Sequence, residues 1–545
     1  GMSDLFVVLV GLSIILYIFL VLATARLAIQ KNLNSILLTI VASVLPIAVI
    51  YFYANQDNIF EAIIISLAIP ILTFLYTVFT KEKEKKSKEN FVFFDNIIME
   101  LTQPFVDLAH TSQALFGLNL SYVLEGLTYF GVVGLLAIFF NDYINLDDID
   151  AGRMVGVLTA GITIAMLFLG ATVDWIGLRK SLIISLSLML GGRILLTFSP
   201  EIGLPGLWNS AHIYAMLGIF GIILGYGIYQ PACYAGVKQL TNEKTSAMGY
   251  AMLYALMNLG GFLPGIISPP IRKSFGITGV FWVYVFLTVV GIGVVYFIIT
   301  KKAMQKATSD LAKNSNVKEE ANPMDNMTGK EKLMYYLKNF PLRDLRFLYF
   351  VFILIFVQTL FAHNWLTIPL YTSRAFEGFV GENFEFFVNL NPILIFILTP
   401  MVTALTSKKD TYTMMIIGTF VMAFPTFILA LGPSFNTLIA YLVIMTIGEA
   451  MWQPRFLQWV AEIAPKNMTG IYMGIGQFPW FLTKVITSIY SGWFIMNYCP
   501  DNTPIAELNT ETMWFIYGCI AIVSPVGLLL AKNWMKKGFK VKHEQ

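Results

Sequence analysis

The residues with the clearest chemical potential are ionisable side chains inside long apolar runs. Glu125 and Glu449 are carboxylates in two such runs, and Arg193 and Lys484 are cations in two others. A charge in an apolar run that crosses a membrane is costly unless it faces a cavity or an opposite charge, so such residues commonly bind protons or charged solutes. Glu449 is the strongest single candidate for this role.

Several polar side chains in these runs have two interpretations. Arg193 is either the counter-ion of a carboxylate or a side chain that extends to the outer interface. His363 either titrates or binds solute near neutral pH, or it lies at an interface beside Trp365. We expect Lys484, which follows Trp480 by one helical turn, to face a cavity. The aromatic residues that either line this cavity or pack in the core are Tyr129, Phe130, Tyr226, Tyr229, Tyr254 and Trp480.

The sequence gives little support for other kinds of site. Cys233, Cys499 and Cys519 lack metal-ligand spacing, and the four histidines are widely separated, so we expect no metal, disulfide or cofactor. No nucleophile and base occur in a recognisable arrangement, which argues against an enzyme. The net charge of +3 is small and scattered, which argues against a nucleic-acid partner.

The composition indicates which solvent surrounds these residues. Hydrophobic residues make up 57% of the 545 residues and charged residues only 13%, and the mean hydropathy is +0.70. A soluble protein of this length needs more polar surface, so we predict an all-α integral membrane protein whose partner is the lipid bilayer. The first apolar run, residues 5–22, lacks a preceding basic segment, so we expect a membrane helix there and not a cleavable signal peptide.

About fifteen runs of about 20 residues each are apolar enough to cross a bilayer. Three come first, six follow a charged and amphipathic stretch, and six more follow a hydrophilic linker. The predicted parts are 1–80, with three extra helices; 81–113, a charged and amphipathic cytoplasmic linker; 114–300, a six-helix bundle; 301–344, a second cytoplasmic linker that is flexible at 309–328 and helical at 329–339; and 345–545, a second six-helix bundle with a basic tail.

Loop charges predict the orientation, because Lys and Arg are retained on the cytoplasmic side. With the N-terminus outside, most basic loops fall inside and acidic loops, such as those with Asp142 and Asp501, fall outside. The exceptions are Arg272, Lys273 and Arg374. We therefore expect a multi-pass protein of the cell inner (plasma) membrane with its N-terminus outside and its C-terminus in the cytoplasm.

A loop motif gives the first family resemblance. Residues 170–180 read G-A-T-V-D-W-I-G-L-R-K and lie between the second and third predicted helices of the first bundle. This resembles the G-x-x-x-D-x-x-G-x-R-K loop of the major facilitator superfamily, whose fold has two six-helix bundles. The glycines allow a tight turn, and Asp174 can pair with arginines or helix ends when the inner gate is closed. The predicted gate residues are Gly170, Asp174, Gly177, Arg179 and Lys180.

Two further helices resemble the proton-coupled oligopeptide transporter family. Residues 250–262, which include Asn258, resemble its F-x-x-x-Y-x-x-x-N-x-G signature. Residues 448–454, which include Glu449 and are followed by A-P at 464–465, resemble its G-E-x-x-x-x-P signature. The resemblance implies that Glu449 faces a central cavity and binds the amino group of the substrate.

The chain departs from this family at three charged positions. Glu125 matches the second glutamate of the family's E-x-x-E-R element, but Tyr122 and Gly126 replace the first glutamate and the arginine. Gln230 replaces a lysine that the family is taken to use for the peptide carboxylate. We predict Glu125 and Glu449 as proton-coupling residues. The predicted substrate-binding residues are Tyr129, Gln230, Asn258, His363, Glu449, Trp480 and Lys484.

These observations favour a secondary transporter that moves a small peptide-like or amine-bearing organic solute by alternating access, coupled to protons. The incomplete E-x-x-E-R element leaves an alternative, namely a non-transporting membrane subunit or receptor that uses the same fold. The three extra N-terminal helices could bind a protein partner, seal the lipid-facing side of a bundle or fix insertion. The sequence does not choose among these roles.

Overall fold

The computed structural model describes residues 2–53, 58–83, 92–314, 326–382, 387 and 390–538. Within these ranges the regular structure is helical. The helices form two compact units, unit 1 (Gly1–His110) and unit 2 (Thr111–Gln545), and each is described by itself. Parts of the charged stretch near residues 81–90 and of the linker stretch at 309–328 lie outside the described residues.

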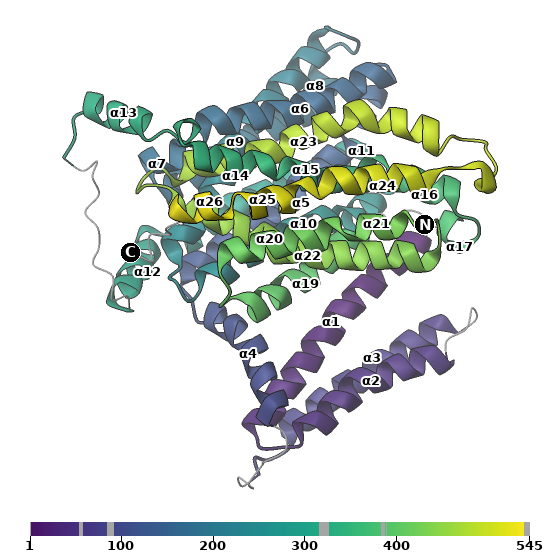
Figure 1. Cartoon of the computed structure of the whole chain (residues 1–545). Coiled ribbons are helices and arrows are strands. Elements are labelled where there is room, and N and C mark those ends of the chain that lie inside the picture. The colour runs from purple at the N-terminus through teal and green to yellow at the C-terminus, as the bar shows by residue number, and fades with distance from the viewer. Residues whose placement is uncertain are drawn as a thin grey trace. The chain divides into compact units, whose positions relative to one another are not determined.

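Unit 1 is a small helical module. It contains α1 (Met2–Gln30), α2 (Ser35–Tyr53), α3 (Ile59–Phe79) and α4 (Val92–Ala109) (Figure 1). The first three helices pack on one another, and α4 packs on α1. Arg26 of α1 donates a 2.7 Å hydrogen bond to Thr102 Oγ1 of α4. Lys31 Nζ donates a 3.1 Å bond to the carbonyl oxygen of Thr77 near the C-terminal end of α3, where a cation compensates the helix dipole.

The first half of unit 2 consists of long apolar helices joined by short loops. Its elements are α5 (Gln113–Asp142), α6 (Asp148–Leu169), α7 (Thr172–Ile176), α8 (Leu178–Ile202), α9 (Ser210–Leu240), α10 (Ser246–Phe262) and α11 (Pro264–Ile298). The backbone stays helical through Leu263, between α10 and α11, and turns sharply inside α11 at Gly276, whose φ is +75°. Glycine tolerates this left-handed conformation, so the chain reverses there and α10 and α11 together supply two crossings.

The second half of unit 2 has more interrupted helices. Its elements are α14 (Leu345–Ile353), α15 (Ile355–Leu366), α16 (Ile368–Ala375), α17 (Phe379–Glu382), α19 (Leu390–Thr406), α20 (Thr411–Ala423), α21 (Pro425–Leu429), α22 (Phe435–Ile463), α23 (Thr469–Tyr498), α24 (Thr510–Ala521), α25 (Val523–Leu530) and α26 (Lys532–Gly538). At the break between α14 and α15, Ser524 of α25 accepts from Val357 N at 2.8 Å and donates to Ile353 O at 2.7 Å. One side chain therefore satisfies backbone groups that the break leaves open.

The segment between the two halves is more helical than predicted. Residues 309–314, which we expected to be flexible, belong to α12 (Lys301–Asn314), because Ala307 of this helix is buried and the helix packs on α5 and α9. A second helix, α13 (Gly329–Lys338), begins with a capping box between Thr328 and Glu331, which satisfies backbone N–H groups at its N-terminus.

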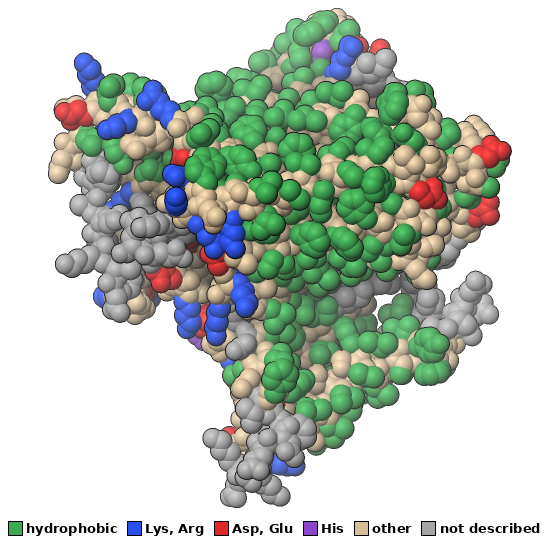
Figure 2. Space-filling view, in the orientation of Figure 1, with side chains coloured by type: hydrophobic (Ala, Val, Ile, Leu, Met, Phe, Trp, Pro, Cys, Tyr) green, Lys and Arg blue, Asp and Glu red, His purple; other side chains and the backbone are tan. Residues whose placement is uncertain are grey.

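The described residues contain 11 helices that are long and apolar enough to cross a membrane, and Leu16–Gln30 and Leu390–Thr406 are shorter apolar helices. Charge separates the two ends of unit 2. In Figure 2, Lys and Arg gather at the end near α12, α13 and α26, and Asp and Glu gather at the opposite end. We call these the basic end and the acidic end. The basic end carries the helix ends and loops with Arg179, Lys238, Lys409, Lys466 and Lys532.

Candidate functional site

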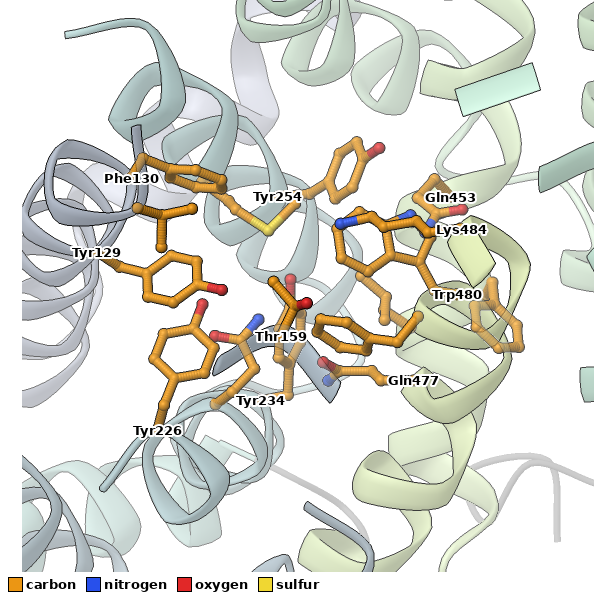
Figure 3. Close-up of a pocket in the computed structure, with 16 residues that line it drawn as sticks. Tyr129, Phe130, Thr159, Tyr226, Tyr234, Tyr254, Gln453, Gln477, Trp480 and Lys484 are labelled. Atoms are coloured by element: carbon orange, nitrogen blue, oxygen red, sulfur yellow. The ribbon is translucent and has the colours of Figure 1, made fainter. Parts of the chain in front are cut away.

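A cavity lies between the two halves of unit 2 (Figure 3). It is bounded by α5, α6, α9 and α10 of the first half and by α22 and α23 of the second. Water-sized molecules can occupy about 120 Å³ of it, well above the ~10–15 Å³ that one water needs, so it can admit a small solute. Its lining residues are Tyr129, Phe130, Val133, Thr159, Tyr226, Gln230, Tyr234, Tyr254, Met257, Gln453, Phe456, Leu457, Gln477, Trp480, Phe481 and Lys484.

Three glutamines give this cavity hydrogen-bonding capacity. Gln230, Gln453 and Gln477 are each more than nine-tenths buried. Each retains a buried amide atom without a hydrogen-bond partner, which is Oε1 in Gln230 and Gln453 and Nε2 in Gln477. Buried polar groups are nearly always paired, so these atoms are positioned to bond with water or solute. The tyrosines add flat walls, and Tyr129 stacks on Tyr226 with ring centroids 4.4 Å apart.

The cavity has one charged lining residue among those described, and it is the lysine expected to face a cavity. Lys484 Nζ lies 3.9 Å from the ring centroid of Trp480 and 5.4 Å from that of Phe481. A cation over an aromatic face is attracted to the π-electrons of the ring. In Figure 3 the side chains of Lys484 and Trp480 come from α23 and face Tyr129 and Tyr226 of the first half.

Glu449 does not line the cavity itself but contacts a residue that does. Its side chain is buried, and Tyr254, a lining residue, donates a 2.5 Å hydrogen bond to Oε1. Asn391 Nδ2 donates 2.9 Å bonds to Glu449 Oε2 and to Thr446 Oγ1. Both carboxylate oxygens therefore already have neutral donors. An amino group could reach Glu449 only by displacing one of them, and binding of an amine by this carboxylate stays a prediction.

Glu125 is paired inside the first half. Arg193 Nη1 donates to Glu125 Oε2 at 2.9 Å, and Nη2 donates to Oε1, so the contact is bidentate. Arg193 Nη1 also donates to Thr288 Oγ1 at 2.9 Å, and both charged side chains are buried. In the structure Arg193 is the counter-ion of a carboxylate, which is the first of its two interpretations. The guanidinium comes from α8. Gly126, at the position where the family has its arginine, packs with its backbone against Gly260 of α10.

Tyr122 and Gln230, the two other departures from the family pattern, are in contact. Gln230 of α9 donates a 2.9 Å hydrogen bond from Nε2 to the hydroxyl of Tyr122 of α5. The positions at which the family has a lysine and a glutamate thus hold a neutral amide and a neutral phenol that bond to each other. The first-half wall of the cavity has no charge at this point.

The loop motif joins the two halves at the basic end. Asp174 of α7 accepts hydrogen bonds from Gly470 N at 2.8 Å and Ile471 N at 3.2 Å, the first turn of α23. A carboxylate at a helix N-terminus compensates unpaired N–H groups and the helix dipole. A Cβ on Gly470 would overlap the carbonyl oxygen of Gly170, so glycine permits this close approach. Gly177 has a φ of +87° and turns the chain into α8.

The basic residues of this end have different contacts. Arg179 stays within the first half, where Nε donates a 3.0 Å bond to Ile299 O at the end of α11. Lys180 is exposed. Lys238, which the motif does not include, crosses to the second half and donates to Ala464 O at 3.0 Å and Thr469 Oγ1 at 3.1 Å. The inter-half contacts of this end therefore depend on Asp174 and Lys238.

The predicted substrate-binding residues separate into two groups. Tyr129, Gln230, Trp480 and Lys484 line the cavity. Glu449, Asn258 and His363 are not among its lining residues. Asn258 Nδ2 donates to the backbone oxygen of Tyr254 at 3.0 Å. His363 is fully buried in the second half, where it stacks on Tyr517 with centroids 3.9 Å apart and contacts Thr367 Oγ1 at 2.7 Å and Tyr490 OH at 3.1 Å.

Several residues of this region were not predicted from the sequence, among them Gln453, Thr159 and Asn391. Gln453 and Thr159 line the cavity, and Asn391 holds Glu449 in place. Gln453 and Asn391 are polar residues in apolar runs, so a systematic search for such residues would have found them. Nothing in the sequence distinguishes Thr159 from the threonines that bond only to their own helix.

Comparisons with known proteins agree with this arrangement. A sequence model of the Major Facilitator Superfamily matches residues 118–488. The chain is 16% identical to the proton:xylose symporter XylE bound to 6-bromo-6-deoxy-D-glucose, with a TM-score of 0.53 over 77% of this chain and 96% of that chain. It is also 16% identical to a peptide transporter POT in complex with sulfate, with a TM-score of 0.50 over 78% of this chain and 96% of that chain. No curated protein sequence matches this chain significantly.

At this identity the structural likeness shows the fold alone. The chain has an all-α membrane fold with two six-helix bundles and an additional N-terminal three-helix module, so the predicted fold class is confirmed. The resemblance on which the sequence interpretation rests is confirmed as well.

Proposed function

The chain belongs to the major facilitator superfamily, a family of secondary transporters, and we propose that it carries a small peptide-like organic solute across the membrane by alternating access, coupled to protons. The observation that carries this proposal is the cavity between the two halves, which has free amide atoms and a cation in its wall. In alternating access, the two halves rock around a central site that opens to one side at a time.

The inter-half contacts support one particular state of such a cycle. The hydrogen bonds of Asp174 and Lys238 and the 3.1 Å bond from Gln458 Nε2 to Ser246 Oγ all join the halves between the cavity and the basic end. Because basic loops stay on the cytoplasmic side, we assign this end to the cytoplasm. The protein is then closed toward the cytoplasm, and we propose that solute enters from the acidic end.

Glu449 is the better candidate for the proton-carrying group. Its described partners, Tyr254 and Asn391, are both neutral, so a proton can bind without separating an ion pair. Protonation of Glu125 would break bonds to Arg193. A proton on Glu449 changes the charge of a carboxylate that is hydrogen-bonded directly to Tyr254, a residue of the cavity wall. We therefore propose that Glu449 senses both the proton and the amino group of the solute, which it reaches when Tyr254 moves aside.

The remaining assignments are part of the same proposal. The transport unit comprises the bundles at 114–300 and 345–545, joined by the linker at 301–344. The protein lies in the plasma membrane, with the N-terminus outside and the C-terminus in the cytoplasm. The helices at residues 1–80 bind a protein partner, seal the lipid-facing side of a bundle or fix insertion, and the segment at 81–113 connects them to the transport unit.

Uptake into proteoliposomes tests the function. Purified full-length protein is reconstituted and given an inward proton gradient and a panel of peptide-like solutes: alanylalanine, N-acetyl-alanylalanine and alanylalanine amide. We expect gradient-dependent accumulation that is weaker for N-acetyl-alanylalanine, which has no amino group for Glu449 to bind, and that is lost in Glu449→Gln. The control is Glu507→Gln, because Glu507 is exposed.

Two outcomes would contradict the proposal. Accumulation that is equal with and without the gradient would remove proton coupling. Absence of uptake together with stoichiometric co-purification of another membrane protein would favour the alternative, a non-transporting subunit or receptor.

A further inference from the structure

The cavity has a cation that no carboxylate among the described residues neutralises. Lys484 takes part in no ion pair among the described residues, and its described contacts are the rings of Trp480 and Phe481. The buried carboxylates Glu449 and Glu125 already have hydrogen-bond partners, Tyr254 and Arg193 respectively. A cation in a membrane-spanning helix is costly unless it is paired, so Lys484 is positioned to attract an anionic group of a solute.

The aromatic contact holds the ammonium without using up its hydrogen-bonding capacity. A lysine ammonium has three N–H donors and no acceptor, and the Trp480 ring attracts it through its face. The side chain of Lys484 is partly exposed to the cavity, and the cavity is lined by Trp480 and Phe481 next to it. The N–H groups directed away from the rings are therefore available to an acceptor in the cavity.

Among the described lining residues, the opposite wall offers no competing charge. Gln230 faces the cavity as a neutral amide, and its Nε2 is already bonded to Tyr122, which leaves Oε1 as an acceptor. An anionic group of a solute would be weakly attracted there. The charge asymmetry of the cavity thus orients a solute with its anionic end toward α23.

We propose that Lys484, held on Trp480, is the anion-binding pole of the cavity and that it binds the carboxylate of a peptide-like solute. This inference rests on the proposed function. The body of the solute lies between the free amide atoms of Gln230, Gln453 and Gln477, which offer two acceptors and one donor. A peptide group, which has one donor and one acceptor, complements this set.

Binding of three matched probes to purified full-length protein tests the inference. Alanylalanine and N-acetyl-alanylalanine have a carboxylate, and alanylalanine amide does not. We expect calorimetry to show that both carboxylates bind at least about tenfold more tightly than the amide, since a charge-assisted hydrogen bond is roughly twice as strong as a neutral one. Lys484→Met should remove this preference, and Lys484→Arg should keep most of it. The control is Lys409→Met, because Lys409 is exposed.

Three results would overturn the inference: equal affinity for the amide, an unchanged preference in Lys484→Met, or no binding of any of the three probes. These results are separable from failure of the proposed function. Vesicle uptake that persists in Lys484→Met would support the proposed transport function and contradict the role of Lys484 as the anion-binding pole. If the unmodified protein binds carboxylates and Lys484→Met does not, but no uptake into vesicles occurs, the anion-binding pole would be supported and the transport function contradicted.

Discussion

The hydroxyl of Tyr254 donates a 2.5 Å hydrogen bond to Glu449 Oε1, and this bond joins the two halves of unit 2 beside the central cavity. Tyr254 is on α10 and Glu449 is on α22. Any rocking of the halves that separates these helices must break this bond, so it links the state of the carboxylate to the relative position of the halves.

Replacing Tyr254 with Phe tests this link. The variant keeps the ring but removes the donor, and a hydrogen bond to a charged group contributes about 1.5–3 kcal/mol. We expect the closed state of the basic end to be roughly tenfold less favoured. Spin labels at Lys180 and Lys409, exposed residues on opposite halves, should show a larger population at long distance. In Tyr229→Phe, whose lost bond to Ser121 lies within the first half, the distance distribution should not change.

The same pair of labels tests Asp174. In Asp174→Asn the side chain can still accept a hydrogen bond from the first turn of α23, but it loses the charge that interacts with the helix dipole, an effect of up to about 2 kcal/mol in a partly buried site. We expect more of the population to open at the basic end. Asp142→Asn, an exposed change at the acidic end of α5, is the control. Unchanged distances in Asp174→Asn would mean that other contacts hold the end closed.

Glu125→Gln should lower stability more than it lowers coupling. The change leaves Arg193 buried without a carboxylate, and removing one partner of a buried ion pair costs about 3–5 kcal/mol. We expect a large fall in the unfolding temperature in detergent and partial recovery in the double variant Glu125→Gln, Arg193→Gln. If instead the variant keeps its stability and loses only gradient-driven accumulation while solute exchange persists, Glu125 carries the proton as the family resemblance predicts.

The neutral pair of Tyr122 and Gln230 can be converted to a charged pair. Gln230→Lys alone places an unpaired cation in a buried position, so we expect it to be destabilising. Adding Tyr122→Glu supplies a carboxylate to the position that Gln230 now contacts. A double-mutant cycle on the unfolding free energy should give a favourable interaction of about 0.5–3 kcal/mol between the two changes. An interaction energy of zero would show that the two side chains are not in contact in the protein.

Cysteine labelling tests the proposed topology of unit 1. A cysteine at Asn58, before α3, should react with a membrane-impermeant reagent from outside, and one at Lys81, after α3, only from inside. The positive-inside rule and an odd number of crossings give this pattern. Reversed accessibility would place the N-terminus inside and require one crossing more or fewer.

The sequence by itself was enough to predict that the chain lies in a membrane, that it is helical and which family it resembles. The apolar runs have the length of a bilayer crossing, and their backbone groups can be satisfied only inside a helix in lipid. For that reason α5 begins at Gln113 and α14 at Leu345, next to the predicted starts of the two six-helix bundles at 114 and 345. The loop motif with Asp174 indicated the fold class, because glycine spacing and a charged residue at a helix junction are local properties that can be read directly from a sequence.

Only the tertiary structure decided which polar residues meet. Glu125 and Arg193 are 68 residues apart, and Tyr254 and Glu449 are 195 apart, and no local pattern specifies such pairs. The sequence offered Lys484 and His363 as similar candidates, yet packing places Lys484 in the cavity wall and His363 in a closed aromatic cluster. The physical reason is that helix rotation about its axis, set by the packing of all neighbouring helices, decides whether a polar side chain faces a cavity or the core.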